Sequence, residues 1–282
     1  NCAIAASRSG ARVGYLTRLG DDTFADDFLE LWRRESIDSA HVRKETGTQT
    51  GIYFITHTEE GHSFSYRRAG SAASRLEPTD IPERYVAGAR VLHVSGISQA
   101  ISDTAADAVF HAIDVARAGG TLVSFDPNLR LSLWSLSRAR AAIHSAMEDC
   151  DIALPGYDDA VKLTGRENPD AIADFYLNLG ARVVALTLGE QGTLVAAPEQ
   201  RERVPALSIV PVDATGAGDT FDGAFLAEYL RSGDPFAAAR YANTAAGLST
   251  RGWGAIAPIP TRGEVEAVLQ DKPERRLAAS PS

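Results

Sequence analysis

The sequence predicts an α/β fold built on a largely parallel sheet. Strand-like and helix-like segments alternate along the chain, and the strand-like ones, such as residues 90–96 and 121–126, are short apolar runs. Short apolar runs between amphipathic helices are typical of parallel strands, because helices cover such sheets. A glycine-containing loop that enters a helix near Ala217 adds a ligand-binding feature to this pattern.

The composition limits the classes of partner. With 282 residues the chain is long enough for one large domain. Its 28 basic and 37 acidic residues give a formal charge of −9, which disfavours nucleic acid and anionic membrane surfaces. Cys2 and Cys150 stand apart, without metal-ligand spacing, as is usual in a reducing cytoplasm. We therefore expect a cytoplasmic protein that binds neither nucleic acid nor membranes.

The first third of the chain contains a departure from the strand–helix rhythm. Residues 1–8 predict a helix, residues 12–19 a strand and residues 23–35 an amphipathic helix. Residues 50–58 and 62–68 then read as two consecutive strands joined by Glu-Glu-Gly, which predicts a β-hairpin. Such a hairpin cannot bury both faces on the main sheet, so we expect a lid. A plain surface hairpin is the alternative.

The remaining elements follow the α/β pattern to the end of the chain. The expected strands cover residues 90–96, 121–126, 151–154, 182–188, 192–197 and 207–212. The expected helices cover residues 102–118, 158–163, 169–179, 217–230, 235–248 and 262–269, followed by a frayed tail over residues 271–282.

The loop before the helix at Ala217 predicts an anion site. Gly216 and Gly218 allow close backbone approach and dihedral angles that side chains forbid, and the N–H groups of the first helical turn lack partners. The helix dipole favours a phosphate there. Asp219 would repel that phosphate unless it faces the attacking hydroxyl as a general base. A helix-capping role for Asp219 is the alternative.

Residues 213–221, Asp-Ala-Thr-Gly-Ala-Gly-Asp-Thr-Phe, resemble the C-terminal signature of the ribokinase-like (phosphofructokinase-B) family of small-molecule kinases. The resemblance runs over residues 1–266 and implies a three-layer α/β/α kinase domain over residues 1–282, with a β lid at about residues 41–74. It also implies that Asp219 is the catalytic base and that Gly216, Ala217 and Gly218 form the anion hole. Asn1 matches a sugar-reading asparagine that follows the family's first strand, so we expect that strand to be missing from the given chain.

Residues 65–74 resemble the lid segment of 2-keto-3-deoxygluconate kinases, a resemblance that implies that Tyr66 and Arg68 read a sugar acid. An arginine can grip a carboxylate through two parallel hydrogen bonds. Solvated strand residues are the alternative. Residues 126–134 resemble the same group, and the resemblance implies that Asn128 and Arg130 reach the nucleotide and substrate. Arg130 is then the group that gathers transition-state charge, although Asn128 could instead cap a turn.

The resemblance also implies the rest of the binding site. The backbone of Ile97 is expected to line the sugar pocket. The remaining predicted ATP-binding residues, beside Asn128 and the anion hole, are Thr187, Gly189, Gly192 and Asn243. Gly189 and Gly192 could equally form a tight turn. Asp159 stands where many relatives carry a magnesium-ordering Glu. The expected cofactors are ATP and Mg²⁺, with a monovalent cation near Asp213.

These resemblances predict ATP-dependent phosphorylation of 2-keto-3-deoxy-D-gluconate to its 6-phosphate. The alternatives are another ribokinase-like kinase that acts on a neutral sugar or nucleoside, and a catalytically idle sugar-acid sensor. Gluconate and galactonate derivatives differ at one stereocentre, which leaves that choice open. Because the hairpin has apolar residues such as Ile52 and Phe54, we expect a homo-oligomer formed through the lid.

Overall fold

The computed structural model describes residues 1–58 and 61–271; within these, the side chains of residues 55–58, 61–64 and 66 are also outside the description. The chain divides into two compact units. Unit 1 comprises Asn1–Val13, Leu188–Val195 and Glu202–Ser282, and unit 2 comprises Gly14–Thr187 and Ala196–Arg201.

Unit 2 contains the predicted parallel strands. Its four neighbouring strands, in the order β8-β7-β6-β5, are β5 (Val91–Ser95), β6 (Leu122–Asp126), β7 (Ile152–Ala153) and β8 (Val183–Thr187). All three pairings are parallel. The register pairs Ser95 with Asp126, so β5 and β6 end side by side. The α/β class with a mainly parallel sheet is therefore confirmed.

The helices of unit 2 follow the strands as the alternation predicts. They are α2 (Thr23–Arg34), α3 (Glu83–Ala87), α4 (Gly96–Ala100), α5 (Asp103–Gly119), α6 (Leu136–Glu148), α7 (Tyr157–Thr164) and α8 (Pro169–Leu179), with 3₁₀ helices η1 (Ala72–Arg75) and η2 (Pro78–Asp80). Helix α5 packs on β5 and β6. It begins where the Ser102 hydroxyl accepts the Ala105 N–H, and it ends at the left-handed Gly120.

A short parallel pair precedes this sheet. Strands β1 (Thr17–Gly20) and β2 (Val42–Glu45) pair in their own two-stranded sheet. The predicted strand over residues 12–19 is thus wrong in its first half, where only Gly14 forms an isolated bridge, to Asp38. Strand β2 was not predicted, because three of its four residues are charged.

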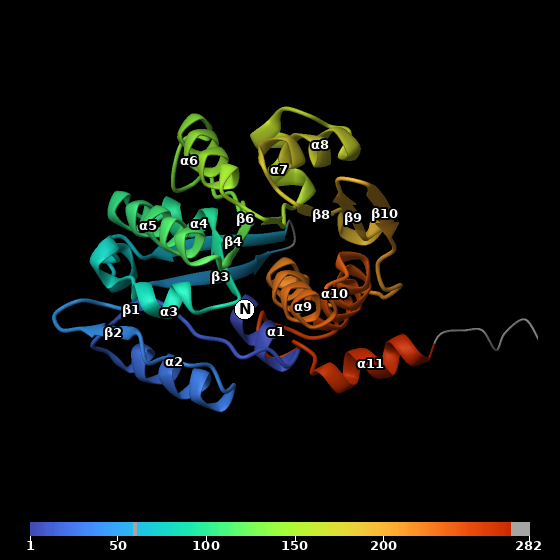
Figure 1. Cartoon of the computed structure of the whole chain (residues 1–282). Helices are drawn as coiled ribbons and strands as arrows, with labels where there is room; N and C mark the ends of the chain where they lie inside the picture. Colours follow the sequence, from blue (N-terminus) through green and yellow to red (C-terminus); the bar gives the residue numbers. More distant parts are fainter. Residues whose placement is uncertain (59–60, 272–282) are drawn as a thin grey trace, which may run out of the picture. The chain divides into compact units, whose positions relative to one another are not determined.

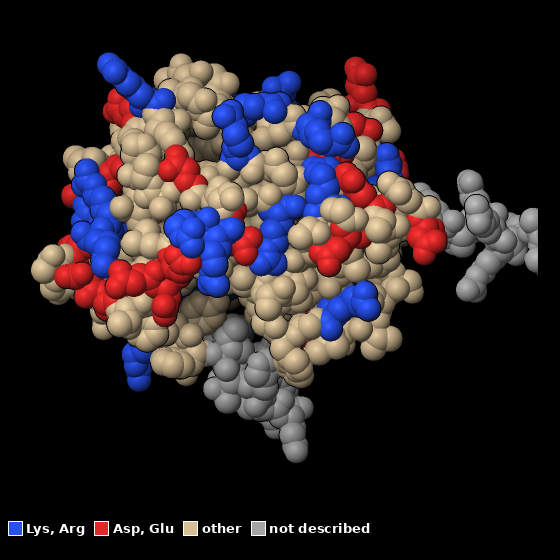
Figure 2. Space-filling view, turned by 90° about the horizontal axis from the view of Figure 1, so that it is seen from below, with Lys and Arg blue, Asp and Glu red and all other residues tan. Residues whose placement is uncertain are grey.

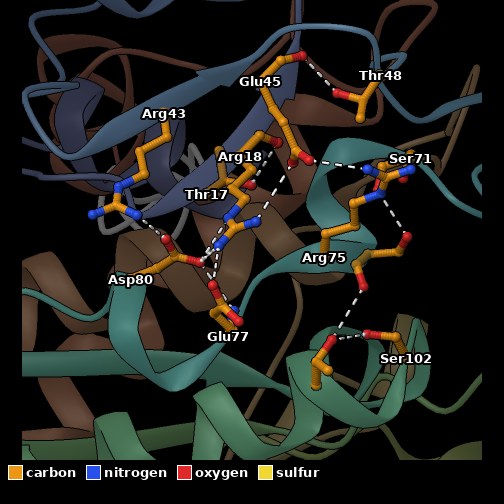
Figure 3. Close-up of polar contacts among 12 residues, drawn as sticks. Thr17, Arg18, Arg43, Glu45, Thr48, Ser71, Arg75, Glu77, Asp80 and Ser102 are labelled. Carbon is orange, nitrogen blue, oxygen red and sulfur yellow. Dashed lines mark hydrogen bonds and ion pairs between the residues drawn. The ribbon is translucent and has the colours of Figure 1, made fainter.

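Charged side chains fasten this pair to η2. Arg18 of β1 donates to Asp80 at 2.6 Å and to Glu77 at 2.8 Å (Figure 3). Asp80 also accepts from Arg43 at 2.5 Å, and its side chain is only 3% exposed. A carboxylate so buried needs both partners to offset the loss of its hydration.

The predicted hairpin is confirmed as a separate antiparallel sheet of β3 (Ile52–Thr58) and β4 (Gly61–Arg67). Its register pairs Ile52 with Arg67 and Thr58 with Gly61. Residues 59 and 60, between the two strands in sequence, are not described. The lid function of the hairpin stays a prediction.

Unit 1 is built around a buried helix. Its helices are α1 (Cys2–Arg8), α9 (Ala217–Ser232), α10 (Pro235–Ser249), α11 (Arg262–Gln270) and the 3₁₀ turn η3 (Gly189–Gln191). Helix α9 lies beside α10 and beside α1, which comes from the opposite end of the chain (Figure 1). A Cβ placed on Gly223 of α9 would lie 2.2 Å from the carbonyl oxygen of Cys2. Glycine is therefore what allows α1 and α9 to approach so closely.

A buried carboxylate ties α9 to α11. Glu228 is 4% exposed and accepts from Arg231 at 2.9 Å and from Arg262 at 3.0 Å. Arg262 also donates to the Ser9 carbonyl at 2.8 Å and lies 4.9 Å from the centre of the Tyr241 ring. Burial alone would raise the pKa of Glu228, but the hydrogen bonds from the two arginines outweigh it and lower that pKa.

The predicted strand over residues 207–212 is wrong. Residues 207–212 have no regular secondary structure. The strands that precede them are β9 (Thr193–Ala197) and β10 (Gln200–Val204), which are neighbours in the sheet and are divided between the units. Prolines at 205 and 211 cannot donate to a ladder, and Val210 is 87% exposed. The segment is held at its end, where the Val212 N–H donates to the Thr250 carbonyl at 2.7 Å.

Charges of both signs share the surface. Figure 2 shows Lys and Arg side chains interspersed with Asp and Glu on one face. Among the described residues, no helix is both long and apolar enough to cross a membrane.

Candidate active site

In unit 1, the glycine loop enters α9 as predicted. Gly216 is the N-cap of the helix and has a left-handed φ of 76°. A Cβ on Gly216 would lie 2.9 Å from the Cβ of Ala255, so both dihedral angle and space require glycine. Gly218 differs from the prediction: its φ lies outside the left-handed region, within the first turn of α9. A Cβ built there meets no described heavy atom within 4 Å, so this glycine leaves the helix end open.

The loop before α9 is held by Asp213. Its carboxylate accepts from the Thr215 N–H at 2.9 Å, the Thr215 hydroxyl at 2.6 Å and the Gly254 N–H at 2.9 Å. Asp213 is 4% exposed, and each hydrogen bond offsets part of its burial. The carboxylate thus shapes the anion loop. A monovalent cation near this residue stays a prediction.

Asp219 occupies the first turn of α9 and accepts a 2.6 Å hydrogen bond from the side-chain amide of Asn1. The residue before the helix, Gly216, has no side chain with which to cap it. The Ala217 N–H donates to the Ala214 carbonyl at 3.1 Å, so this amide of the predicted anion hole already closes a turn. The amides of the first helical turn have no acceptor within the helix itself.

In unit 2, a second loop follows β6. The Asp126 carboxylate accepts the Asn128 N–H at 3.0 Å, an Asx turn that accommodates the φ of 34° at Asn128. The side chain that closes this turn is therefore that of Asp126, whereas the sequence had offered Asn128 as the capping residue. The side-chain oxygen of Asn128 is buried and has no hydrogen-bond partner among the described residues. Such an atom is available to a ligand or a water.

Both backbone polar groups of Leu129, in two adjacent peptides, are hydrogen-bonded to side chains. Its N–H donates to the Asp159 carboxylate at 2.9 Å, and its carbonyl accepts from the guanidinium of Arg130 at 3.0 Å. Burial raises the pKa of Asp159, although the Leu129 N–H and the charge of Arg130 oppose that shift. The structure thus brings the predicted residues Arg130 and Asp159 to the same loop.

Ile97 lies beside this loop. Gly96, at the start of α4, is buried, and a Cβ placed on it would lie 2.1 Å from the Pro127 carbonyl oxygen. Only glycine permits so close an approach. Ile97 is half-buried and follows β5, whose end pairs with Asp126. Open α/β sheets bind ligands at this carboxyl edge.

Tyr66 and Arg68, the residues predicted to bind a sugar acid, lie at the end of the hairpin. Tyr66 pairs with Tyr53 in the ladder, but its side chain lies outside the described part of the structure. Arg68 follows the last residue of β4 and is half-buried, while Arg67 is exposed. The guanidinium carbon of Arg68 lies 5.8 Å from the centre of the Tyr53 ring, within the range of a cation–π contact.

The predicted nucleotide residues have structural contacts of their own. In unit 1, Gly189 and Gly192 both have positive φ, and the Leu188 N–H donates to the Gly192 carbonyl at 2.7 Å, so they form a tight turn. Asn243 accepts from Thr193 at 2.7 Å and donates to the Val204 carbonyl at 3.0 Å.

In unit 2, the Thr187 N–H donates to the Pro155 carbonyl at 3.0 Å. Contacts of any of these four predicted residues with nucleotide stay predictions.

Three contributors were not anticipated in these roles. Asp126 and Asp213 shape the two loops through their backbone partners, and Asn1 holds the Asp219 side chain. The Asp-x-Asn and Asp-x-Thr spacings are detectable signals for the first two, whereas Asn1 and Asp219 are too far apart in sequence. Within the described part of the chain, no group of three or more His, Cys, Asp or Glu residues is placed to hold a metal ion.

Comparison with known proteins gives consistent matches. Residues 1–262 match the model of the pfkB family carbohydrate kinases. The chain is 34% identical over 275 residues to 2-dehydro-3-deoxygluconokinase of Thermoproteus tenax, covering 96% of this chain and 83% of that protein. It is 30% identical over 282 residues to fructokinase-1 of Zea mays, covering 96% and 86%.

A solved structure agrees with these matches. Fructokinase from Vibrio cholerae O395, in its fructose, ADP and calcium ion bound form, superposes with a TM-score of 0.85 at 27% identity, covering 94% of this chain and 88% of that chain. The family model spans almost the whole sequence, and the fold and the glycine loop into α9 agree with it. This chain belongs to the pfkB family of carbohydrate kinases.

Proposed function

We propose that the protein transfers a phosphoryl group from ATP to the terminal hydroxyl of 2-keto-3-deoxy-D-gluconate, giving the 6-phosphate and ADP. The observation that carries the substrate is Arg68, a half-buried arginine at the end of the hairpin, together with the similarity to a 2-dehydro-3-deoxygluconokinase. A partly desolvated guanidinium suits a carboxylate through paired hydrogen bonds. A neutral sugar offers no group of that kind.

The proposed chemistry assigns each loop one task. Asp219 accepts the proton of the attacking hydroxyl, a role for which its anchored side chain is suited. The other amides of the first turn of α9, next to the open space over Gly218, bind the transferred phosphoryl group. Arg130 stabilises negative charge that develops during the transfer.

ATP is the proposed donor, and Mg²⁺ the proposed metal. The similar fructokinase was solved with ADP and a calcium ion, which supports a nucleotide accompanied by a divalent cation. The described residues offer no three-carboxylate cluster, which fits a metal held mainly by phosphate oxygens and water. When bound, Mg²⁺ neutralises phosphate charge. The proposed nucleotide contacts are Thr187, Gly189, Gly192, Asn128 and Asn243.

A neutral-sugar kinase is the second candidate. The 30% identity to a fructokinase favours it. Fructose has no carboxylate for Arg68 to bind, so the two candidates differ in what they require of Arg68. The deciding experiment measures ADP release from ATP with 2-keto-3-deoxygluconate, 2-keto-3-deoxygalactonate, fructose and ribose. We expect kcat/KM for a sugar acid to exceed that for fructose by at least about tenfold, as one charge-assisted contact would give. Faster use of fructose would establish the second candidate instead.

We also propose that copies of the chain associate through the hairpin. Phe54 is 56% exposed and Tyr53 is 42% exposed, and an uncovered sheet edge favours pairing. Sedimentation velocity of the wild type against Phe54→Ser tests this, because a hairpin-mediated assembly would dissociate in the variant. An unchanged sedimentation coefficient would place the contact elsewhere.

A further inference from the structure

The carboxylate of Asp159 has a structural partner that its predicted metal role does not explain. One of its oxygens accepts the N–H of Leu129 at 2.9 Å. Asp159 belongs to α7 and Leu129 to the loop after β6, so this bond joins two elements 30 positions apart. Leu129 is 5% exposed, and a buried N–H without a partner is strongly unfavourable.

The loop needs such an anchor because its backbone is strained. Asn128 has a φ of 34°, one of two positive values at non-glycine residues of the described chain. Residues in this region persist only where their surroundings hold them. The Asp126 side chain holds the near side of Asn128. Asp159 holds the far side, at the next peptide.

Arg130 follows directly after Leu129 and bonds to its carbonyl. The Leu129 carbonyl, which belongs to the peptide plane after the one that Asp159 holds, accepts from the Arg130 guanidinium at 3.0 Å. Asp159 therefore fixes the backbone immediately before the carbonyl to which Arg130 bonds.

We infer that Asp159 is a positioning residue: its oxygen fixes the Leu129 N–H, and thereby the backbone that orients Arg130, and this role requires a hydrogen-bond acceptor rather than a negative charge. The part of the inference that concerns catalysis rests on the proposed function. A metal ligand would need the charge, because a neutral amide is a much weaker ligand for Mg²⁺ than a carboxylate. The two roles therefore separate in a single substitution.

The experiment compares Asp159→Asn, Asp159→Ala and the control Asp158→Asn, which removes the same charge from the exposed neighbour in the same helical turn. The first measurement is amide hydrogen exchange at Leu129, which does not depend on activity. We expect Asp159→Ala to accelerate it about ten- to a hundredfold, the loss of one buried hydrogen bond. Asp159→Asn and Asp158→Asn should leave it within a few-fold of wild type.

The second measurement is steady-state kinetics with Mg²⁺ titrated at fixed ATP. Asp159→Ala should lower kcat about tenfold or more, whereas Asp159→Asn should keep it within a few-fold at an unchanged Mg²⁺ requirement. If Asp159→Asn loses kcat or needs more Mg²⁺ while Leu129 stays protected, the charge is what matters and the inference is wrong. Unchanged exchange in Asp159→Ala overturns it as well.

These outcomes remain separable from failure of the proposed function. A wild type that phosphorylates no sugar acid refutes the proposed substrate, but exchange at Leu129 still decides whether Asp159 holds the loop. If Asp159→Ala does not fold, Asp159→Asn suffices, because its predicted near-normal kcat and Mg²⁺ requirement can each be contradicted.

Discussion

The side-chain amide of Asn1 donates a 2.6 Å hydrogen bond to the carboxylate of Asp219, 218 positions along the chain. The bond is possible because α1 packs closely on α9 at Gly223. One lone pair of the proposed base is thus fixed by a neutral donor, which restricts the rotamer of the carboxylate without protonating it. A fixed base reacts faster than a mobile one.

Removal of this donor should slow the reaction. We expect Asn1→Ala to lower kcat about tenfold, equivalent to about 1.4 kcal/mol of barrier, and to leave the affinity for ATP nearly unchanged. Steady-state kinetics with both substrates varied provide the measurement, and Cys2→Ala, at the adjacent position, is the control. If Asn1→Ala retains kcat within twofold, the contact does not position the base.

Loss of the base itself should be more severe. Asp219→Asn preserves shape and removes only the ability to accept a proton. We expect kcat to fall by orders of magnitude, while calorimetry shows ATP binding largely intact and thermal unfolding shows the fold intact. A variant that retained more than about a tenth of wild-type kcat, a barrier change under about 1.4 kcal/mol, would exclude Asp219 as the base.

The helix contact that brings Asn1 to α9 can be tested by two matched substitutions. Gly223→Ala places a Cβ 2.2 Å from the Cys2 carbonyl oxygen, so α1 must shift. We expect a loss of about 1–3 kcal/mol in the free energy of unfolding. Gly263→Ala, on α11, meets no described heavy atom within 4 Å, so helix propensity should stabilise it by up to about 1 kcal/mol.

Urea unfolding followed by circular dichroism measures both variants. If Gly223→Ala lowers the free energy of unfolding and Gly263→Ala raises it, the loss at Gly223 comes from the contact between α1 and α9 and not from helix propensity. Equal effects would show that helix packing at Gly223 tolerates a side chain.

The Glu228 cluster predicts how stability depends on pH. Its folded-state pKa lies below the usual value of 4.5, so its contribution is present above about that pH and is lost as the pH falls through the folded pKa. We expect Glu228→Gln to lower Tm by a few degrees at pH 7, and the difference from wild type to shrink as the pH falls below 4.5. Glu190→Gln, an exposed control, should match wild type throughout. A Tm difference that is constant between pH 7 and pH 3.5 would contradict the assignment.

Local chemistry made most of the fold predictable. The apolar runs of β5 to β8 and the glycine loop into α9 follow directly from residue patterns. Strand β2 was not predicted because three of its four residues are charged. The apolar alternation of residues 207–212 gave a wrong prediction. Pro205 before the segment and Pro211 within it cannot donate to a ladder, and Val210 is exposed, so the pattern has no partner strand.

The candidate site was predictable in its residue types and less so in its contacts. The left-handed Gly216 follows from a glycine at a helix start, but the open space over Gly218 depends on what surrounds it. Asp159 was assigned to a metal by its place in the sequence, and its hydrogen bond to Leu129 depends on how α7 packs. Contacts between distant segments carry no local signal.

The most direct test of the proposed substrate is the ratio of kcat/KM for 2-keto-3-deoxygluconate to that for fructose, measured in Arg68→Leu and Arg67→Leu. Each variant removes one positive charge from the end of the hairpin, but Arg68 is half-buried and Arg67 is exposed. If Arg68 grips the carboxylate, its loss should lower that ratio by roughly thirtyfold or more, the cost of about 2 kcal/mol for a charge-assisted pair, and Arg67→Leu should leave it unchanged. Equal effects of the two substitutions, or equal losses with the acid and the neutral sugar, would contradict a carboxylate-reading role and with it the proposed substrate.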